Sequence, residues 1–481
     1  MKHIPITLIL FFLLAGIVQA QENFQFTLTE AQDYAIEHNK TIQNAKLDVD
    51  KADKQMKEAI SKGLPQVDAT LDWMTYFGYE MKFPSFGSGN DYTTAEILDA
   101  TNQAISAFPG DPNMGLRAVT YQDIYNYQAG AAFSGILQSM NDATIKMTDA
   151  STAKVQIGQL LFSGQYWVGL KVAKLGILIS EQGLDKSILD IKESVTNSYV
   201  MALITQQSIE TFKKSIENLN AIKGYTNNMY KVGMAEQTDV DQLSIQVTML
   251  ENNLRSMERG LQMVYSMMKF QLGIAPEEEL KLSDNLETII AAISPTGPIG
   301  EFDITQNTNY QLLTTQEQIT EKMVEMQKWN YGPTITGFYT YNQKLLTTGF
   351  DMTPNNMAGV TLSLPIFSSG GRKQQLAQAK IDLDKVQLNK SMVEEQLNIQ
   401  YKQLLLDLNT AIENYNSQKE NVAVANRVFE NIHKKYEQGM ASSLDLTQSN
   451  SNYLQAESNY IQATMSLLQA KVAIDKLLNQ L

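Results

Sequence analysis

The sequence contains no cysteine, and only two of its three histidines, His38 and His433, lie beyond the first 20 residues. Disulfide bridges, thiol catalysis and cysteine-ligated metals are therefore excluded. Neither histidine joins a cluster of other metal-ligating side chains, and we expect both at solvated helix positions. No nucleophile elbow, phosphate-binding loop or acid/base pair is recognisable. The sequence therefore predicts that the protein is not an enzyme and has no catalytic residue, cofactor or metal site.

Long hydrophobic runs are missing as well, apart from one at the N-terminus. Residues 4–18 are mostly apolar, follow Lys2 and lead into Val18 and Ala20, where a signal peptidase could cut. We therefore expect residues 1–20 to be a signal peptide. An uncleaved anchor is the alternative, although the run is shorter than the roughly 20 residues of a spanning helix. Because no comparable run follows, any insertion into a membrane must use β-strands.

Basic residues are few relative to acidic ones. The chain has 38 Lys and Arg against 52 Asp and Glu, which gives a formal net charge of −14. This balance argues against nucleic acid as a partner. Proline is also scarce, at 11 residues, and long stretches are rich in Gln, Asn, Lys and Glu. Such a composition favours long solvated helices over a thick globular core.

Two parts of the chain repeat each other. Tyr230, Gly233, Met234 and Ala235 recur 206 residues later as Tyr436, Gly439, Met440 and Ala441, and residues 155–163 recur as 360–368. Further upstream, Asn39 and Pro65 are spaced as Asn307 and Pro333 are, at an offset of 268. The larger upstream offset means that the first copy of the repeat carries an insertion between Pro65 and residue 155.

The repeat predicts how the mature chain is divided. Residues 21–273 form the first structural repeat, and residues 304–481 form the second. Residues 274–303 contain three prolines and are predicted to be a linker, which could pack beside the helices. Residues 79–150 are rich in turn-forming residues and are predicted to be a long extracellular insertion, with a short helix near 94–107.

Mostly apolar residues follow a strict three-and-four spacing from Ile188 to Leu219, interrupted by Ser198 and Thr205, and apolar residues follow it again from Val240 to Met268 after a turn at Gly233. A sustained period of 3.5 residues is typical of coiled-coil packing, here between antiparallel neighbours. The predicted helix at 166–230 would be on the order of 100 Å long at 1.5 Å per residue. Each repeat therefore predicts a long helical hairpin.

Strand-like alternation of polar and apolar residues occurs at 66–73, 334–342 and 360–364, and the repeat adds 155–163. Alternation with Trp and Tyr on the apolar face is expected of a strand between lipid and water. A soluble hairpin with one buried face is the alternative. Four strands cannot close a barrel, which needs about eight or more. If the strands span a membrane, several chains must share one barrel.

The doubled order of helix, strand pair, long helix, turn and helix resembles that of the TolC-type outer-membrane efflux proteins. The resemblance covers essentially the whole mature chain and also rests on residues 362–372 and 436–446. It implies a mainly α fold with a β-barrel portion. In a homotrimer, four transmembrane strands per protomer would form a 12-stranded barrel in outer-membrane lipid of a Gram-negative bacterium. The long antiparallel helices would form a periplasmic tunnel.

The resemblance also implies a function and partners. The chain would be a passive exit duct of a tripartite efflux or type I secretion system, working with a periplasmic adaptor protein and an inner-membrane pump. The adaptor would dock, and the tunnel would close, at two helical tips, whose residues are Gly233, Met234, Ala235, Gly439, Met440 and Ala441. A soluble periplasmic coiled-coil scaffold without a barrel is the alternative function, and membrane fractionation separates the two.

Four residues near the tips resemble the family's gate. Asp239 is similar to the acid that bonds to the tyrosine at Tyr436, and Asp445 is similar to a pore-lining acid. The chain departs from the best-known members at Ala441, where they carry a latching arginine, and at Gln448, where they carry a second acid. Helix capping is the alternative role for Asp445, because Ser442 and Asp445 have the spacing of a capping box. Thr238 and Asp241 have the same spacing.

Overall fold

The computed structural model describes residues 23–82, 144–146, 149–293, 302–346 and 354–481, and the statements below concern these residues. The predicted signal peptide, the predicted helix near 94–107 and most of the predicted insertion lie outside them. The chain divides into two compact units. One is helical and comprises Met1–Ala59, Trp167–Tyr331 and Phe367–Leu481, and the other contains the main sheet and comprises Ile60–Tyr166 and Gly332–Ile366.

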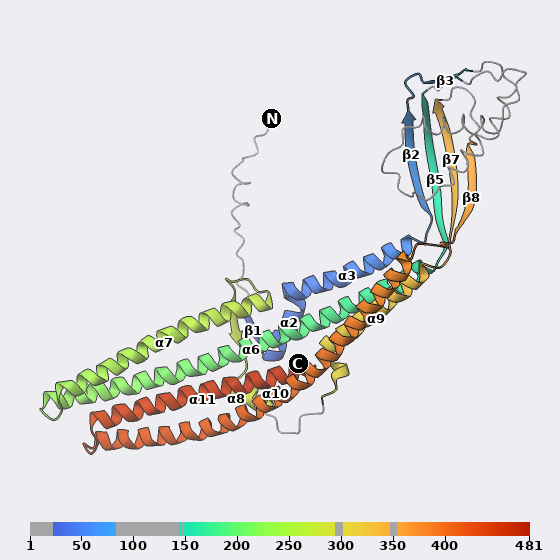
Figure 1. Cartoon of the computed structure of the whole chain (residues 1–481). Helices are drawn as coiled ribbons and strands as arrows, with labels where there is room; N and C mark the ends of the chain where they lie inside the picture. The colour runs from blue at the N-terminus through green and yellow to red at the C-terminus, as the bar shows by residue number, and fades with distance from the viewer. Residues whose placement is uncertain (1–22, 83–143, 147–148, 294–301, 347–353) are drawn as a thin grey trace, which may run out of the picture. The chain divides into compact units, whose positions relative to one another are not determined.

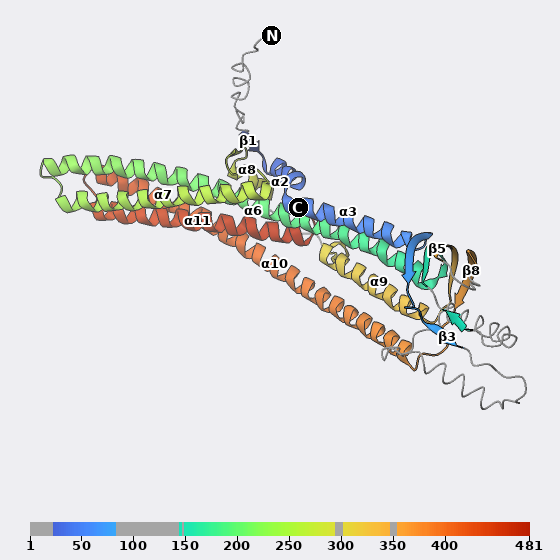
Figure 2. The ribbon, with the colours of Figure 1, turned by 90° about the horizontal axis from the view of Figure 1, so that it is seen from above.

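The helical unit is built around long helices that run alongside one another (Figures 1 and 2). The predicted hairpins are present. The helices of the first half are α2 (Leu28–His38), α3 (Lys40–Ser61), α6 (Gly164–Lys231) and α7 (Gln237–Leu272), and those of the second are α9 (Thr308–Trp329), α10 (Gly371–Glu437) and α11 (Ser443–Leu477). None of the described helices has an apolar segment long enough to cross a membrane.

Asn39 and Asn307 hold equivalent places in the two halves. The side-chain oxygen of each accepts hydrogen bonds from the first backbone N–H groups of the next helix, α3 or α9, and so caps that helix. Each amide nitrogen also donates to a carbonyl at the end of the last helix of its half. Asn39 donates to Gln271 at 2.6 Å, and Asn307 donates to Leu477 at 3.1 Å. The two asparagines are related by the offset of 268 in the sequence repeat, and the residues whose carbonyls accept are related by the offset of 206.

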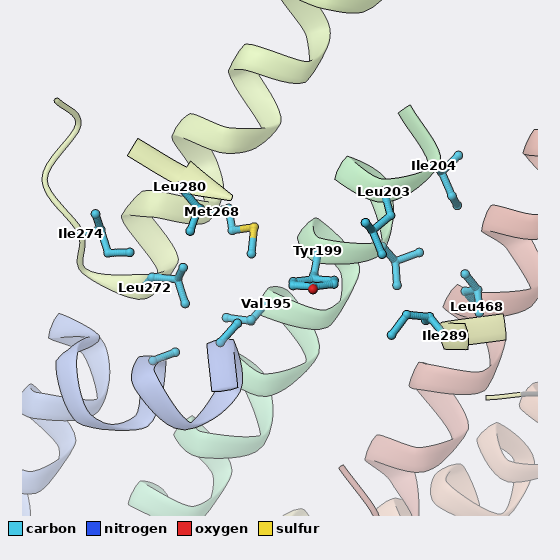
Figure 3. Close-up of a cluster of buried hydrophobic side chains, with 13 residues drawn as sticks. Val195, Tyr199, Leu203, Ile204, Met268, Leu272, Ile274, Leu280, Ile289 and Leu468 are labelled. Carbon is cyan, nitrogen blue, oxygen red and sulfur yellow. The ribbon is translucent and has the colours of Figure 1, made fainter. Parts of the chain in front are cut away.

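The predicted linker contributes to the core of the helical unit. Strand β6 (Glu279–Leu282) pairs in parallel with β1 (Asn23–Phe26), and α8 (Leu286–Ile293) follows. Leu280 and Ile289 are buried beside Tyr199 of α6 in the cluster that Figure 3 shows. The Tyr199 hydroxyl lies 2.9 Å from the Asp284 carboxylate, to which it donates. The segment is therefore part of the folded unit, with elements that the sequence did not predict.

The second unit contains an antiparallel sheet in the order β2-β5-β7-β8. Its strands match the predicted ones, with bounds β2 (Gln66–Met74), β5 (Ala150–Ser163), β7 (Thr334–Leu346) and β8 (Asn356–Ser363). Strand β5 begins at Ala150, five residues before the repeated segment at 155, so the predicted insertion ends where β5 begins. Two short strands in that region, β3 (Glu80–Lys82) and β4 (Thr144–Lys146), pair with each other.

The strand register gives the sheet two unlike faces. One row across it contains Val67, Ile157, Tyr339 and Ala358, and the next contains Asp68, Gln156, Thr340 and Met357. Since side chains alternate along a strand, the first row belongs to an apolar face and the second to a mainly polar face. Phe338 interrupts the polar face. Its ring lies over Gly359, where an added Cβ would come within 2.8 Å of it.

Candidate functional site

The two helical turns have the same backbone geometry. In the first turn the N–H of Met234 donates to the carbonyl of Met229, and in the second the N–H of Met440 donates to that of Lys435, both at 2.8 Å. Gly233 has φ +80° and Gly439 has φ +69°, in the left-handed region where a side chain is strained. In both turns the glycine lies two residues after the last residue of the preceding helix, Lys231 of α6 or Glu437 of α10.

Large apolar side chains are exposed at both turns. Met234 is 72% exposed and Met440 is 66% exposed, with Val232 and Leu444 similarly open beside them. Ala235 and Ala441 are half-buried, and Ala441 packs against a buried cluster of the long helices. Of the predicted docking residues, the methionines and glycines are therefore accessible, and the alanines support the turn.

The acid at Asp445 caps helix α11, as the alternative interpretation predicted. Its Oδ2 accepts from the backbone N–H of Ser442 at 3.1 Å, while the Ser442 hydroxyl accepts from the N–H of Asp445 at 3.1 Å. The hydroxyl also donates to the carboxylate at 2.7 Å. These hydrogen bonds, that of the Ser442 side chain above all, lower the pKa of Asp445 below its ordinary value. The carboxylate is exposed, so capping leaves it available for a second role.

Helix α7 is capped by different residues from those that the spacing predicted. Glu236 holds the N-cap position, and Asp239 Oδ2 accepts from its backbone N–H at 3.0 Å. The Thr238 hydroxyl donates to Glu236, and Asp241 accepts from Gln237. The predicted capping box of Thr238 and Asp241 was therefore wrong, because the helix begins two residues earlier than that pairing requires.

Hydrogen bonds join the two hairpins near their tips. The hydroxyl groups of Tyr436 and Thr226 lie 2.6 Å apart, and the Tyr225 hydroxyl donates to the carbonyl of Glu437 at 3.0 Å. On the other pair of helices, the hydroxyl of Ser443 donates to Asp239 Oδ1. Burial is the main cause of a raised pKa at Tyr436. Its hydroxyl is neutral at physiological pH, and either it or the Thr226 hydroxyl can be the donor in their hydrogen bond. The hairpins are thus joined by hydrogen bonds between neutral groups and by one hydrogen bond to a carboxylate.

The predicted gate residues therefore meet different partners from those expected. Tyr436 was expected to bond to Asp239, but within the chain it bonds to Thr226. Gln448 is exposed and donates to Asn452 on its own helix at 2.9 Å. Sequence reasoning missed Thr226 and Ser443. Thr226 could have been found, because it continues the buried spacing of Leu219 and Ile222.

Neither histidine forms a metal site with other residues. His38 is exposed and stacks on Tyr34, as a solvated helix position would allow, whereas His433 is half-buried and stacks on Phe429. No group of three or more metal-ligating side chains occurs in the described part of the chain. At the tips, the structure brings together helix caps and hydrogen bonds between the two hairpins.

The family model for outer membrane efflux proteins matches residues 315–480. This stretch contains the second strand pair, helices α10 and α11, and the turn at Gly439. Residues 315–480 are thus similar to the outer membrane efflux proteins, and the predicted resemblance to the TolC-type channels is confirmed. No curated protein sequence matches the chain.

Solved outer-membrane channels share the fold. CusC superimposes with a TM-score of 0.69 at 12% identity, over 94% of this chain and 92% of that one. VceC of Vibrio cholerae gives 0.65 at 13% identity, over 94% and 95%, and the open MtrE channel of Neisseria gonorrhoeae gives 0.63 at 13%, over 94% and 88%. The chain is therefore mainly helical and has the fold of these channel proteins. The proteins of the family and of these solved structures are channels, not enzymes.

Proposed function

We propose that three copies of this chain form a channel in the outer membrane of a Gram-negative bacterium. The channel is the passive exit duct of a tripartite efflux or type I secretion system. Energy comes from a pump in the inner membrane, and a periplasmic adaptor protein joins the pump to the helical tips. The family match at residues 315–480 and the shared fold support this assignment.

The observation that carries the proposal is the open sheet with two unlike faces. On the apolar face Leu71 is 70% exposed, Trp73 is 65% exposed and Leu362 is 65% exposed. Exposed apolar side chains in such a row suit contact with lipid, while the opposite face, with Asp68 and Thr340, suits a water-filled lumen. A soluble sheet would instead bury its apolar face.

The edges of the sheet support closure by several copies. Within the described residues, β2 and β8 each pair with one strand only, so each has a free edge. Because neighbouring strands are antiparallel and their number is even, β8 of one copy would meet β2 of the next in antiparallel orientation. Two copies would supply only the minimum of about eight strands, whereas three supply about twelve and leave an open lumen.

The gate of the proposed channel lies at the hairpin tips. Opening would break the Tyr436–Thr226 and Asp239–Ser443 bonds that tie the hairpins together. An adaptor that contacts the exposed Met234 and Met440 would favour the open tip if it bound that arrangement more tightly than the closed one. Three copies of Asp445 near a narrow opening would attract cations.

Membrane fractionation and the mass of the detergent-solubilised protein test the proposal together. We expect the protein in the outer-membrane fraction, resistant to extraction with alkaline carbonate, and three chains in the solubilised particle. A monomer released with the soluble periplasmic proteins would contradict the channel and favour the scaffold function. A known lipid-exposed barrel and a known periplasmic protein of the same cells calibrate the fractions.

A further inference from the structure

Positive charge gathers at the beginnings of α6 and α10. Residues 164–180 of α6 and 371–381 of α10 contain five basic residues and no acid, although the whole chain has a net charge of −14. Neither helix has an acid in its first turn. Arg372 and Lys373 lie in the first turn of α10, where the helix dipole makes a positive charge unfavourable. An anionic partner outside the chain would offset this repulsion.

The exposed stripe at the beginning of α6 combines an aromatic ring with two of these charges. Trp167 is 57% exposed, and Lys171 and Lys174, four and seven residues further on, are exposed as well. Residues at this spacing share one face of a helix. The lysines follow the ring by about 6 and 10 Å along the axis. A tryptophan followed by lysines suits a membrane interface, because the ring lies at headgroup level and the long lysine side chains reach the polar groups.

Helix α9 adds positive charge beside α6. Lys322 Nζ lies 2.7 Å from Glu325 Oε2. This hydrogen bond is the main cause of a pKa of Glu325 below its ordinary value, and the charges of Lys171 and Lys328 lower the pKa further. Three lysines from two helices therefore outnumber the one acid that they share.

The beginning of α10 continues the same surface. The guanidinium carbon of Arg372 lies 5.9 Å from the centre of the Tyr331 ring, just after α9. Tyr331 is 45% exposed, and Phe367, just before α10, is 83% exposed. Figure 2 shows α9 between α6 and α10. The three helices thus form one surface, which we call the basic patch and which is centred on Lys171, Lys328 and Lys373.

We propose that the basic patch binds the phosphate groups of anionic phospholipids in the periplasmic leaflet of the outer membrane. The inference rests on the proposed channel, in which the sheet lies in lipid. Helix α6 follows β5 directly, and α10 begins seven residues after the end of β8, so the chain connections lead from lipid to the patch. Clustered Lys and Arg beside a membrane segment attract anionic headgroups. The patch therefore gives an acidic protein a local attraction to an anionic leaflet.

Tryptophan quenching tests the contact, because the chain has only three tryptophans, Trp73, Trp167 and Trp329. The full-length Trp73→Phe/Trp329→Phe variant is reconstituted in phosphatidylcholine vesicles that contain a fixed fraction of brominated phosphatidylglycerol or brominated phosphatidylcholine. In low salt, we expect the anionic lipid to quench Trp167 about threefold more than the zwitterionic lipid does. The preference should fall as salt is raised. Equal quenching by the two lipids in low salt would overturn the proposal.

Charge-neutralising variants assign the preference to the patch. In the variant that has only Trp167, Lys171→Gln/Lys328→Gln/Lys373→Gln should abolish the preference for phosphatidylglycerol. The same three positions changed to Arg should retain it, because the charge remains. A preference that survives the three Gln substitutions, in a variant whose native mass shows three chains, would contradict binding at the patch.

A matched control removes the same amount of charge elsewhere. Lys231, Lys434 and Lys435 are exposed lysines near the helical tips. Changing these three to Gln should leave the lipid preference of Trp167 unchanged. A loss equal to that of the patch variant would show that net charge, and not the patch, attracts the lipid.

The failure of this inference is distinguishable from the failure of the channel. The Trp167→Phe/Trp329→Phe variant retains only Trp73, on the apolar face of β2, and brominated phosphatidylcholine should quench it. If Trp73 is quenched but Trp167 shows no lipid preference, the patch faces the lumen or a neighbouring copy, and the channel stands. If neither lipid quenches Trp73, the proposed channel fails, and lipid binding at the patch fails with it.

Discussion

Glycine at each helical tip is required by the backbone, and substitution there tests the turn directly. Gly439 has φ +69°, with open space around the position of a Cβ. Gly439→Ala should therefore destabilise the turn by backbone strain alone, by about 1–2 kcal/mol. Gly260→Ala, in the middle of α7, should instead stabilise that helix by about 0.5–1 kcal/mol. Hydrogen exchange of the hairpin amides measures both, and equal effects at the two sites would contradict this account of the tip.

Capping by Asp445 predicts a pH dependence. Its pKa is lowered in the folded chain, so its contribution to stability is present above the unfolded value of about 3.9 and is lost as pH falls through the folded pKa. Asp445→Asn should therefore speed opening of the α11 N-terminus at pH 5–8, and the difference from the natural chain should vanish as pH falls below about 4. Asp407→Asn, within α10, is the control and should leave the opening of the α11 N-terminus unchanged.

The same carboxylate predicts ion selectivity if it also faces the lumen. Three exposed copies of Asp445 around an opening should make the purified channel cation-selective in a planar bilayer, most clearly in low salt. Asp445→Asn should shift the reversal potential toward zero. If the variant shows faster helix opening but unchanged ion selectivity, Asp445 acts only as a helix cap.

The partners of single side chains were less predictable from the sequence than the residues themselves. The turn at Gly439 and the cap at Asp445 depend on neighbours within a few residues, and local spacing was enough to predict them. The hydrogen bonds of Tyr436 and Asp239 depend on how one hairpin is rotated about its long axis relative to the other. This relative rotation is set by packing between residues about 200 positions apart in the sequence. The spacing of residues along one helix does not determine it.

The long helices and main strands were predictable because each carries its own periodicity. Period 3.5 predicted α6 and α7, period two predicted β2, β7 and β8, and the repeat added β5. Strands β1 and β6 were not predicted. Each has only four residues, and they pair in parallel across more than 250 residues of sequence. Short strands of this kind lack a local signal, because their partner supplies the stabilisation.

The two faces of the sheet predict opposite responses to charge. Leu362 and Ser363 are adjacent exposed residues of β8 on different faces. Leu362→Lys should reduce the amount of assembled protein in the outer membrane, since a lipid-facing Lys costs about 2–4 kcal/mol at mid-bilayer. Ser363→Lys should have little effect, because a lumen-facing charge remains hydrated. Comparable losses in both variants would contradict a lipid-facing side.

The assembled molecule explains features that are costly in a single chain. Apolar side chains on the sheet and on the long helices stay open to solvent in one copy, and β2 and β8 have free edges in the described part of the chain. Lipid and neighbouring copies cover all of them in the proposed trimer.

A density map of the particle purified from the outer membrane tests the trimeric channel most directly. It should show three copies around one axis, with the sheets joined β8 to β2 into one closed barrel and the helices continuing as a tunnel. A particle with separate, unjoined sheets, or a number of copies other than three, would contradict the account.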